Sequence, residues 1–100
     1  MKLGLNLVGP QVQKHRIKRG WSQSVLARKL QLQGWSVSTG SVGKLEAQLR
    51  RVPDCELLFL AKVLGVSIPE LFPKGAALKQ LGPLFQSGRR QAIFPTRGER

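Results

Sequence analysis

The sequence predicts an all-α fold of five short helices followed by a basic C-terminal tail. Between residues 8 and 72, apolar side chains recur at helical spacing in five segments, and short breakers separate these segments. No stretch alternates apolar and polar residues for long enough to indicate a sheet. A chain of 100 residues can bury one modest core, so we expect one domain over residues 1–73 and a tail over residues 74–100.

The first two helices are predicted from the residues at their ends. Pro10 suits the first turn of a helix that begins at Gly9 or Pro10, and Gly20 stops this helix after Arg19. The second helix begins at Ser22, whose hydroxyl can cap the free amides of the first turn. Its spacing turns three apolar side chains inward, namely Leu26, Ala27 and Leu30.

The third helix is predicted to be weak on its own. It begins near Ser38, which can act as a cap, and it contains Gly40 and Gly43. Each glycine costs about 1 kcal/mol relative to alanine inside a helix. We therefore expect packing or a ligand to hold this helix. The following "AQLRR" has no breaker, which suggests that the helix extends toward Arg50 and Arg51.

The fourth helix carries the clearest signals. Pro53 and a capping Asp54 lead into it, and Gly65 ends it. Its inward stripe is predicted to comprise Leu57, Leu60, Ala61 and Leu64. Ser67 then caps a short fifth helix, "IPELF".

The charge balance indicates an anionic partner. The chain has 17 Lys and Arg against 5 Asp and Glu, a formal net charge of +12, so nucleic acid is the first candidate. A membrane is not expected, because no run of about 20 apolar residues occurs. The opening "MKLGLNLVGP" is too short and interrupted for a secretory signal, so we expect a cytoplasmic protein.

Catalysis and metal binding find no support in the sequence. Cys55 has no second cysteine with which to form an internal disulfide, and with His15 alone it cannot assemble a zinc site. The stretch "STGSVGKLE" superficially suggests a nucleotide-phosphate loop. That motif, however, needs a glycine at position 38, where this chain has Ser38, and a serine or threonine at position 45, where it has Leu45. We therefore predict a binding protein, with no enzymatic activity and no cofactor.

Three segments together resemble a known family. They are "GWSQSVLARKL" (20–30), "STGSVGKLE" (38–46) and "ELLFLAKVLGVSIPELF" (56–72), preceded by Arg16. Over residues 8–72 the chain resembles the helix-turn-helix domain of phage repressors and Cro, and of the related small bacterial regulators of XRE type. The resemblance implies a five-helix repressor-like helix-turn-helix bundle. It also implies a sequence-specific transcriptional regulator that binds double-stranded DNA.

The resemblance also implies roles for individual residues. Gln23 matches a glutamine that grips a DNA phosphate and braces the recognition helix, which spans about residues 38–46. Arg16 and Glu46 match a buried structural salt bridge. The candidates for contacts with base edges or nearby phosphates are Ser38, Thr39, Ser41 and Lys44. Beyond that helix, Arg50 and Arg51 are equally well explained as phosphate contacts or as solvated charge.

Two features depart from the pattern of the family. The connection "QLQGWSVS" is several residues longer than the usual turn between the two helices, and we expect Trp35 to cover the enlarged corner. The two glycines leave the third helix with few large side chains for base recognition.

Some apolar residues exceed what a monomeric core needs. Leu58 and Phe59 lie off the inward stripe of the fourth helix. One of the two, with Ile68 and Phe72, is predicted to contribute to a homodimer contact or to pack beneath the tail.

Two alternative functions remain open at the level of sequence. The tail is basic and rich in glycine, with apolar islands "LGPLF" and "AIF", which would suit an antitoxin-like module that binds a partner protein. A nucleic-acid-binding protein without sequence preference is the other alternative.

Overall fold

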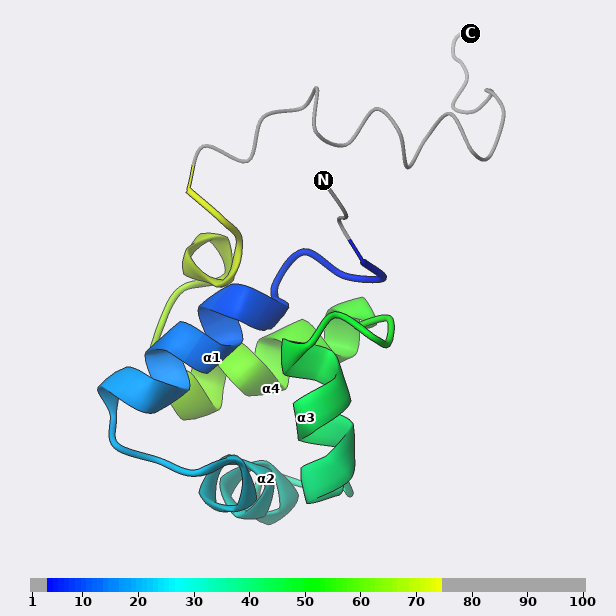
Figure 1. Cartoon of the computed structure of the whole chain (residues 1–100). Coiled ribbons are helices and arrows are strands. Elements are labelled where there is room, and N and C mark those ends of the chain that lie inside the picture. The colour runs from blue at the N-terminus through cyan, green and yellow to red at the C-terminus, as the bar shows by residue number, and fades with distance from the viewer. Residues whose placement is uncertain (1–3, 75–100) are drawn as a thin grey trace, which may run out of the picture.

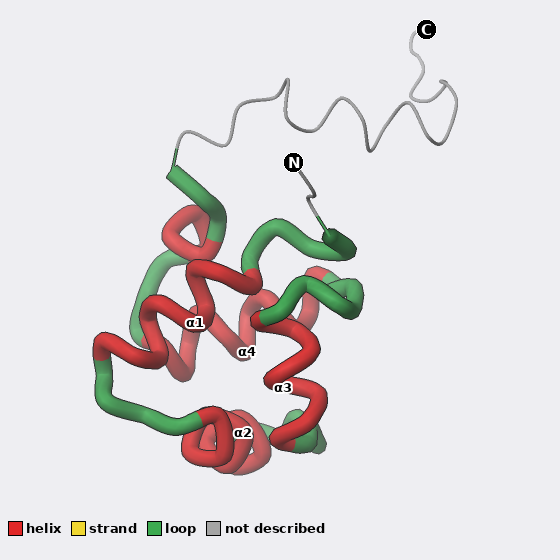
Figure 2. Tube along the Cα trace, in the orientation of Figure 1, coloured by secondary structure: helices red, strands yellow, loops and turns green. Residues whose placement is uncertain are grey.

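Four α-helices and one 3-10 helix form the described part of the protein, residues 4–74 of a computed structural model (Figures 1 and 2). In chain order they are α1 (Gly9–Lys18), α2 (Gln23–Leu32), α3 (Thr39–Glu46), α4 (Asp54–Leu64) and the 3-10 helix η1 (Ile68–Leu71). The predicted all-α class is confirmed. Apart from Lys74, the predicted tail lies outside the described residues, as does its predicted contact with a partner protein.

The helices pack around one apolar core. In Figure 1, α1 crosses in front of α4, α3 runs along one side of this pair, and α2 lies beneath. Contacts join α3 to both α1 and α2, and they join α4 to α1, α2 and η1. Every helix contributes fully buried side chains: Val12, Leu26, Leu30, Val42, Leu45, Leu60, Leu64 and Leu71.

Local sequence signals set most of the helix ends. The Ser22 hydroxyl accepts a hydrogen bond from the Val25 amide at 3.1 Å, and this caps α2. Ser38 caps α3 in the same way, with the Ser41 amide at 3.0 Å. Gly65 ends α4 in the left-handed region at φ 68°, where glycine carries no steric penalty. These predicted caps and stops are confirmed.

Packing compensates for the weak third helix, as expected. Val42 and Leu45 are each 1% exposed. Burying a side chain of this size contributes about 1.5–3 kcal/mol. That exceeds the cost of about 1 kcal/mol for each glycine in α3.

The prediction that the third helix extends toward Arg50 and Arg51 is wrong. The helix ends at Glu46, and Gln48 adopts the left-handed region at φ 64°. The amide of Leu49 then donates to the carbonyl of Lys44 at 2.8 Å, and that of Gln48 donates to the carbonyl of Leu45 at 3.0 Å. These are the bonds of a Schellman motif, which normally requires glycine. No glycine marks this end in the sequence.

Three details of the last two helices also differ from the prediction. Asp54 is the first residue of α4 rather than its cap, because Pro53 occupies the cap position and no side chain caps this end. Leu57 is half-buried, at the margin of the core. The fifth helix is a single 3-10 turn, in which both the amide and the hydroxyl of Ser67 donate to the carboxylate of Glu70, at 2.7 and 2.8 Å.

An N-terminal clasp, residues 4–9, holds the C-terminal end of α3. The Asn6 side-chain amide donates to the carbonyls of Leu45 at 3.0 Å and Arg50 at 2.8 Å, and its oxygen accepts from the Gly9 amide at 2.8 Å. The Gln48 side chain in turn donates to the Asn6 carbonyl at 2.8 Å. A side chain at Gly9 would collide with the Leu45 carbonyl. The clasp therefore depends on a small residue and an amide at fixed positions.

No helix within residues 4–74 is long and apolar enough to cross a bilayer.

We expect Asn6→Ala to lower the free energy of unfolding by about 1–3 kcal/mol, because three partly buried hydrogen bonds are lost. Asn6→Asp keeps the acceptor for Gly9 and loses both donated bonds, so a similar loss would assign the effect to the donors. Urea denaturation measures both changes, with exposed Gln13→Ala as the control. Equal stability of wild type and Asn6→Ala would show that the clasp does not hold α3.

Candidate nucleic-acid interface

The connection between α2 and α3 is longer than a tight turn, yet it is closed by packing. Val37 is buried, and its carbonyl accepts a hydrogen bond from the Gln31 side chain at 2.7 Å. Trp35 is half-buried against Phe59, with ring centroids 6.0 Å apart. Trp35 thus covers this corner, as predicted, and the extra residues leave α3 in contact with α2.

A buried polar network joins α1, α2 and α3. Arg16 Nε lies 2.6 Å from Glu46 Oε2, and Arg16 Nη2 lies 2.9 Å from Glu46 Oε1. Gln23 Nε2 donates to the same Oε1 atom at 3.0 Å, and Arg16 also donates to the Trp21 carbonyl at 2.8 Å. The hydrogen bond to Glu46 raises the pKa of Arg16, while burial acts in the opposite sense. Glu46 therefore serves as the common acceptor that fixes the end of α3.

Gly43 lies against Gln23. A β-carbon at Gly43 would be 3.3 Å from Gln23 Oε1, which is tighter than ordinary van der Waals contact. At Gly40, by contrast, the nearest atom would be Ser38 Oγ at 3.9 Å. The glycine at 43 therefore gives room to the bracing side chain, whereas the glycine at 40 has no such steric reason.

The predicted contact residues of α3 have different surroundings. Ser38 uses its hydroxyl as the helix cap, and Ser41 is half-buried. Thr39 and Lys44 are exposed. The side of α3 turned away from the core thus offers small groups and one lysine.

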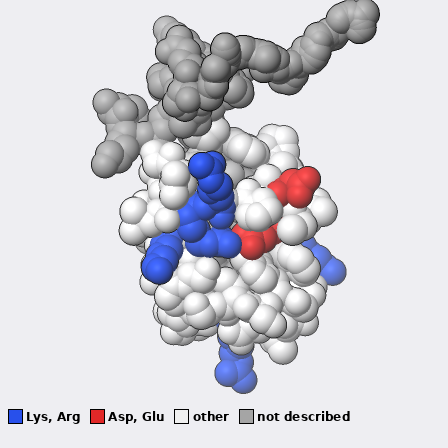
Figure 3. Space-filling model, turned by 90° about the vertical axis from the view of Figure 1, so that its right-hand side faces the viewer, with Lys and Arg blue, Asp and Glu red and all other residues white. Residues whose placement is uncertain are grey.

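The two arginines after α3 are not equivalent. Arg50 forms two hydrogen bonds with the Glu56 carboxylate, at 2.9 and 3.1 Å, whereas Arg51 is exposed. On the side of the molecule that carries α3, Figure 3 shows a group of basic side chains next to acidic ones, and further basic side chains at the right edge and at the bottom, while most of the surface is uncharged. Arg51 is accordingly the freer of the two for a ligand.

The four residues predicted for a dimer contact differ in their exposure to solvent. Leu58 is 65% exposed. Phe59, Ile68 and Phe72 are half-buried and pack against the core. Cys55 is exposed, and no group of three potential metal ligands occurs among the described residues.

Sequence reasoning missed the clasp, and therefore Asn6. The only local signal is an asparagine between Gly4 and Gly9, which predicts a turn but not its partner.

Two adjacent helices, the second exposed along one side and locked to the first, define the class of helix-turn-helix DNA-binding domains. Residues 12–71 match the family model described as helix-turn-helix, and the chain belongs to this family. This family, of XRE (Cro/C1) type, consists of DNA-binding transcription regulators.

Two solved structures are similar to this chain. The restriction-modification controller protein C.AhdI from Aeromonas hydrophila is 29% identical with a TM-score of 0.57, over 65% of this chain and 91% of that one. The DNA-binding domain of BldD is 28% identical with a TM-score of 0.58, over 69% of this chain and 93% of that one. No curated protein matches the chain significantly.

We expect Glu46→Ala to lower the free energy of unfolding by about 3–5 kcal/mol, because the buried Arg16 would lose its compensating charge. The matched control is Glu56→Ala, which breaks a more exposed pair and should cost about 1 kcal/mol or less. Urea denaturation distinguishes the two. Similar losses in both variants would mean that the buried Arg16–Glu46 pair contributes no more to the free energy of unfolding than the more exposed pair.

Gly40→Ala and Gly43→Ala form a second matched pair. We expect Gly40→Ala to stabilise the domain by about 0.5–1 kcal/mol through helix propensity. Gly43→Ala should gain less or lose stability, because its methyl group meets Gln23. The difference should disappear when Gln23 is also changed to alanine. Equal gains in the wild-type background, measured by thermal unfolding, would contradict the steric role of Gly43.

Proposed function

We propose that the protein is a sequence-specific transcriptional regulator that places α3 in the major groove of double-stranded DNA. The observation that carries this proposal is the fixed position of α3: its C-terminal end is held by the Arg16–Glu46–Gln23 network while Thr39 and Lys44 stay exposed. A major groove admits an α-helix, and the base edges in that groove distinguish all four base pairs. The family of the chain and the two similar structures support the proposal.

Phosphate contacts would set the register of α3 on the duplex. Gln23 has two amide hydrogens and gives one to Glu46, so the other is available to a phosphate while the residue braces α3. Lys44 and Arg51 are exposed, and they supply positive charge before and after the turn that follows α3. Arg50 is held by Glu56, so we assign it to positioning of the loop rather than to a primary contact.

Base recognition would come from few side chains. Thr39 and Ser41 lie in the first turn of α3, and Ser38 contributes chiefly as the cap. Because Gly40 carries no side chain, the backbone of α3 can approach the groove closely there. We propose that specificity arises from short polar and methyl contacts together with the shape of the DNA.

We further propose that the regulator acts as a homodimer in the cytoplasm, with Leu58 in the contact. Leu58 is the exposed member of the predicted set. A two-fold dimer would read two half-sites about one helical turn apart.

Selection of bound duplexes from a random pool at physiological salt tests the proposal. We expect an enriched consensus with a two-fold repeat. No enrichment, with tight binding to any duplex, would instead favour a nucleic-acid-binding protein without sequence preference. A sequence without the repeat, together with a monomer by light scattering, would contradict the dimer alone.

On the selected duplex, we expect Lys44→Ala to weaken binding about tenfold. If six phosphates are neutralised, the log-log salt slope of wild type should be about −5, and the variant should lose about one unit of slope. Gln23→Ala should also weaken binding while the domain stays folded by circular dichroism. Lys62→Ala on α4 is the control and should change neither affinity nor slope. Unchanged affinity in Lys44→Ala and Gln23→Ala would remove α3 from the interface.

A further inference from the structure

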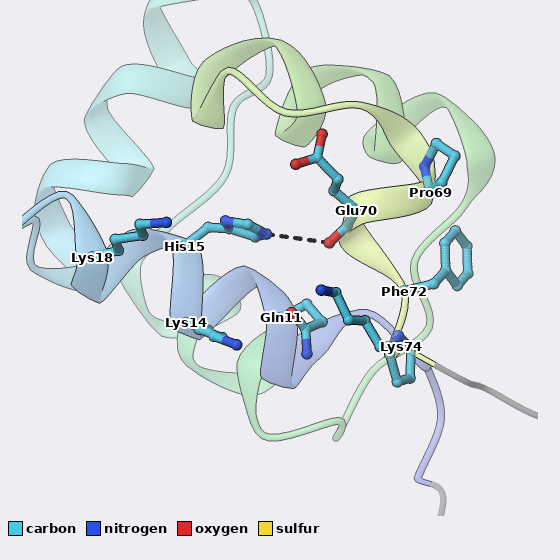
Figure 4. A pocket seen from close by; sticks show the side chains of 9 residues that line it. Gln11, Lys14, His15, Lys18, Pro69, Glu70, Phe72 and Lys74 are labelled. Atoms are coloured by element: carbon cyan, nitrogen blue, oxygen red, sulfur yellow. Dashed lines mark hydrogen bonds between the residues drawn. The ribbon is translucent and has the colours of Figure 1, made fainter.

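A basic groove lies between α1 and the segment that includes η1 and ends at Lys74. This α1–η1 groove encloses a cavity of about 510 Å³. Its walls include Lys14, His15 and Lys18 from α1 and Glu70, Phe72 and Lys74 from the other side (Figure 4). None of these residues is used in the proposed DNA contact.

The groove is on the side of α1 away from α3. At 100° per residue, Lys14 and Lys18 are each about 160° around the helix from Arg16, the residue that ties α1 to Glu46. A duplex seated on α3 would therefore leave the groove open. Its positive charge needs a separate explanation from the contact with DNA.

The charges of the groove are largely unpartnered within residues 4–74. The ammonium groups of Lys14, Lys18 and Lys74 make no salt bridge, and the described residues give them no hydrogen-bond acceptor. The one carboxylate in the wall, Glu70, accepts two hydrogen bonds from Ser67. These bonds are the main cause of the lowered pKa of Glu70, and the nearby charge of Lys18 makes a smaller contribution in the same direction. The walls of the groove thus hold three lysines and one carboxylate, and both hydrogen bonds of that carboxylate go to Ser67.

The spacing of these groups suits an extended peptide. Lys14 and Lys18 are one helical turn apart, about 6 Å along α1. Alternate side chains of an extended chain are about 6.6 Å apart, so two carboxylates at positions i and i+2 would match the two lysines. Phe72 and Pro69 contribute apolar atoms to the opposite wall of the groove.

His15 reinforces the shape of the groove. Its Nε2 atom lies 3.2 Å from the Glu70 carbonyl and joins the two walls, as the dashed line in Figure 4 marks. In the same view, the Lys74 side chain extends toward this hydrogen bond, while the Glu70 carboxylate points away from Lys14 and Lys74.

We propose that the α1–η1 groove binds an acidic, extended peptide segment of a partner protein. A second copy of this chain is a poor occupant, because it carries 17 basic residues and only 5 acidic ones. Closed small-molecule sites are mostly apolar and bury most of the ligand. This groove is instead lined by lysines along one helix face, a geometry that suits a segment lying across the surface.

The test uses the full chain and a fluorescein-labelled hexapeptide in which glutamate alternates with leucine. Fluorescence anisotropy at about 0.15 M salt should detect binding of this peptide. The negative control is a labelled peptide of the same length in which lysine replaces each glutamate. Lys14→Glu with Lys18→Glu should weaken binding at least tenfold, because two attractive pairs become repulsive ones. Arg28→Glu with Lys62→Glu changes the net charge equally on exposed residues outside the groove and should leave the affinity within about twofold.

Each other outcome would overturn the proposal. No binding of the acidic peptide to wild type would remove the groove as a peptide site. An equal loss in both double variants, each folded by circular dichroism, would reduce the effect to net charge. Displacement of the peptide by a duplex, together with weaker DNA binding of the groove variant, would assign the groove to nucleic acid. Because the peptide is first titrated without DNA, the result does not depend on the proposed regulatory function.

Discussion

The buried ion pair between Arg16 and Glu46 is the constraint on which the site depends. Glu46 is the last residue of α3, where a negative charge opposes the helix dipole, and it is only 5% exposed. Without Arg16 and Gln23, a carboxylate would be unfavourable there both for burial and for its place in the helix. A buried pair contributes little net stability compared with an apolar one, so its effect lies in geometry. Its hydrogen bonds join the end of α3 to α1 and, through Gln23, to α2.

The rest of the frame acts on the same helix. Two glycines in eight residues would leave α3 frayed in isolation, yet its start is capped by Ser38 and its end is clasped by Asn6. One of the glycines, Gly43, leaves room for Gln23, whose Oε1 atom would lie 3.3 Å from a β-carbon at this position. At Gly43, therefore, the side chain that helps to hold α3 also disfavours a residue that would stiffen the helix, whereas Gly40 has no such neighbour.

The helix positions followed from the sequence wherever the cause was local. Ser22 and Ser38 cap the helices they precede, and Gly65 needs no partner to end α4. The end of α3 could not be predicted, because Gln48 takes a backbone region that glycine favours and is held by Asn6, 42 positions earlier. The same limit applies to the site. The Arg16–Glu46 pair was expected only from family resemblance, and neither the pairing of Arg50 with Glu56 nor the contact of Gly43 with Gln23 has a spacing signature.

Helix α1 relates the two basic surfaces of the molecule. One of its sides carries Arg16, which orients α3, and the opposite side carries Lys14 and Lys18 of the α1–η1 groove. Coupling between two such sites requires an element with two arrangements that both ligands bias. Within residues 4–74, α1 instead packs through the fully buried Val12 and the buried ion pair, which favour a single arrangement. A peptide in the groove would therefore add a partner to DNA-bound protein without changing the affinity of α3 for DNA. The occupancy of the DNA site and the recruitment of the partner protein would then be set independently.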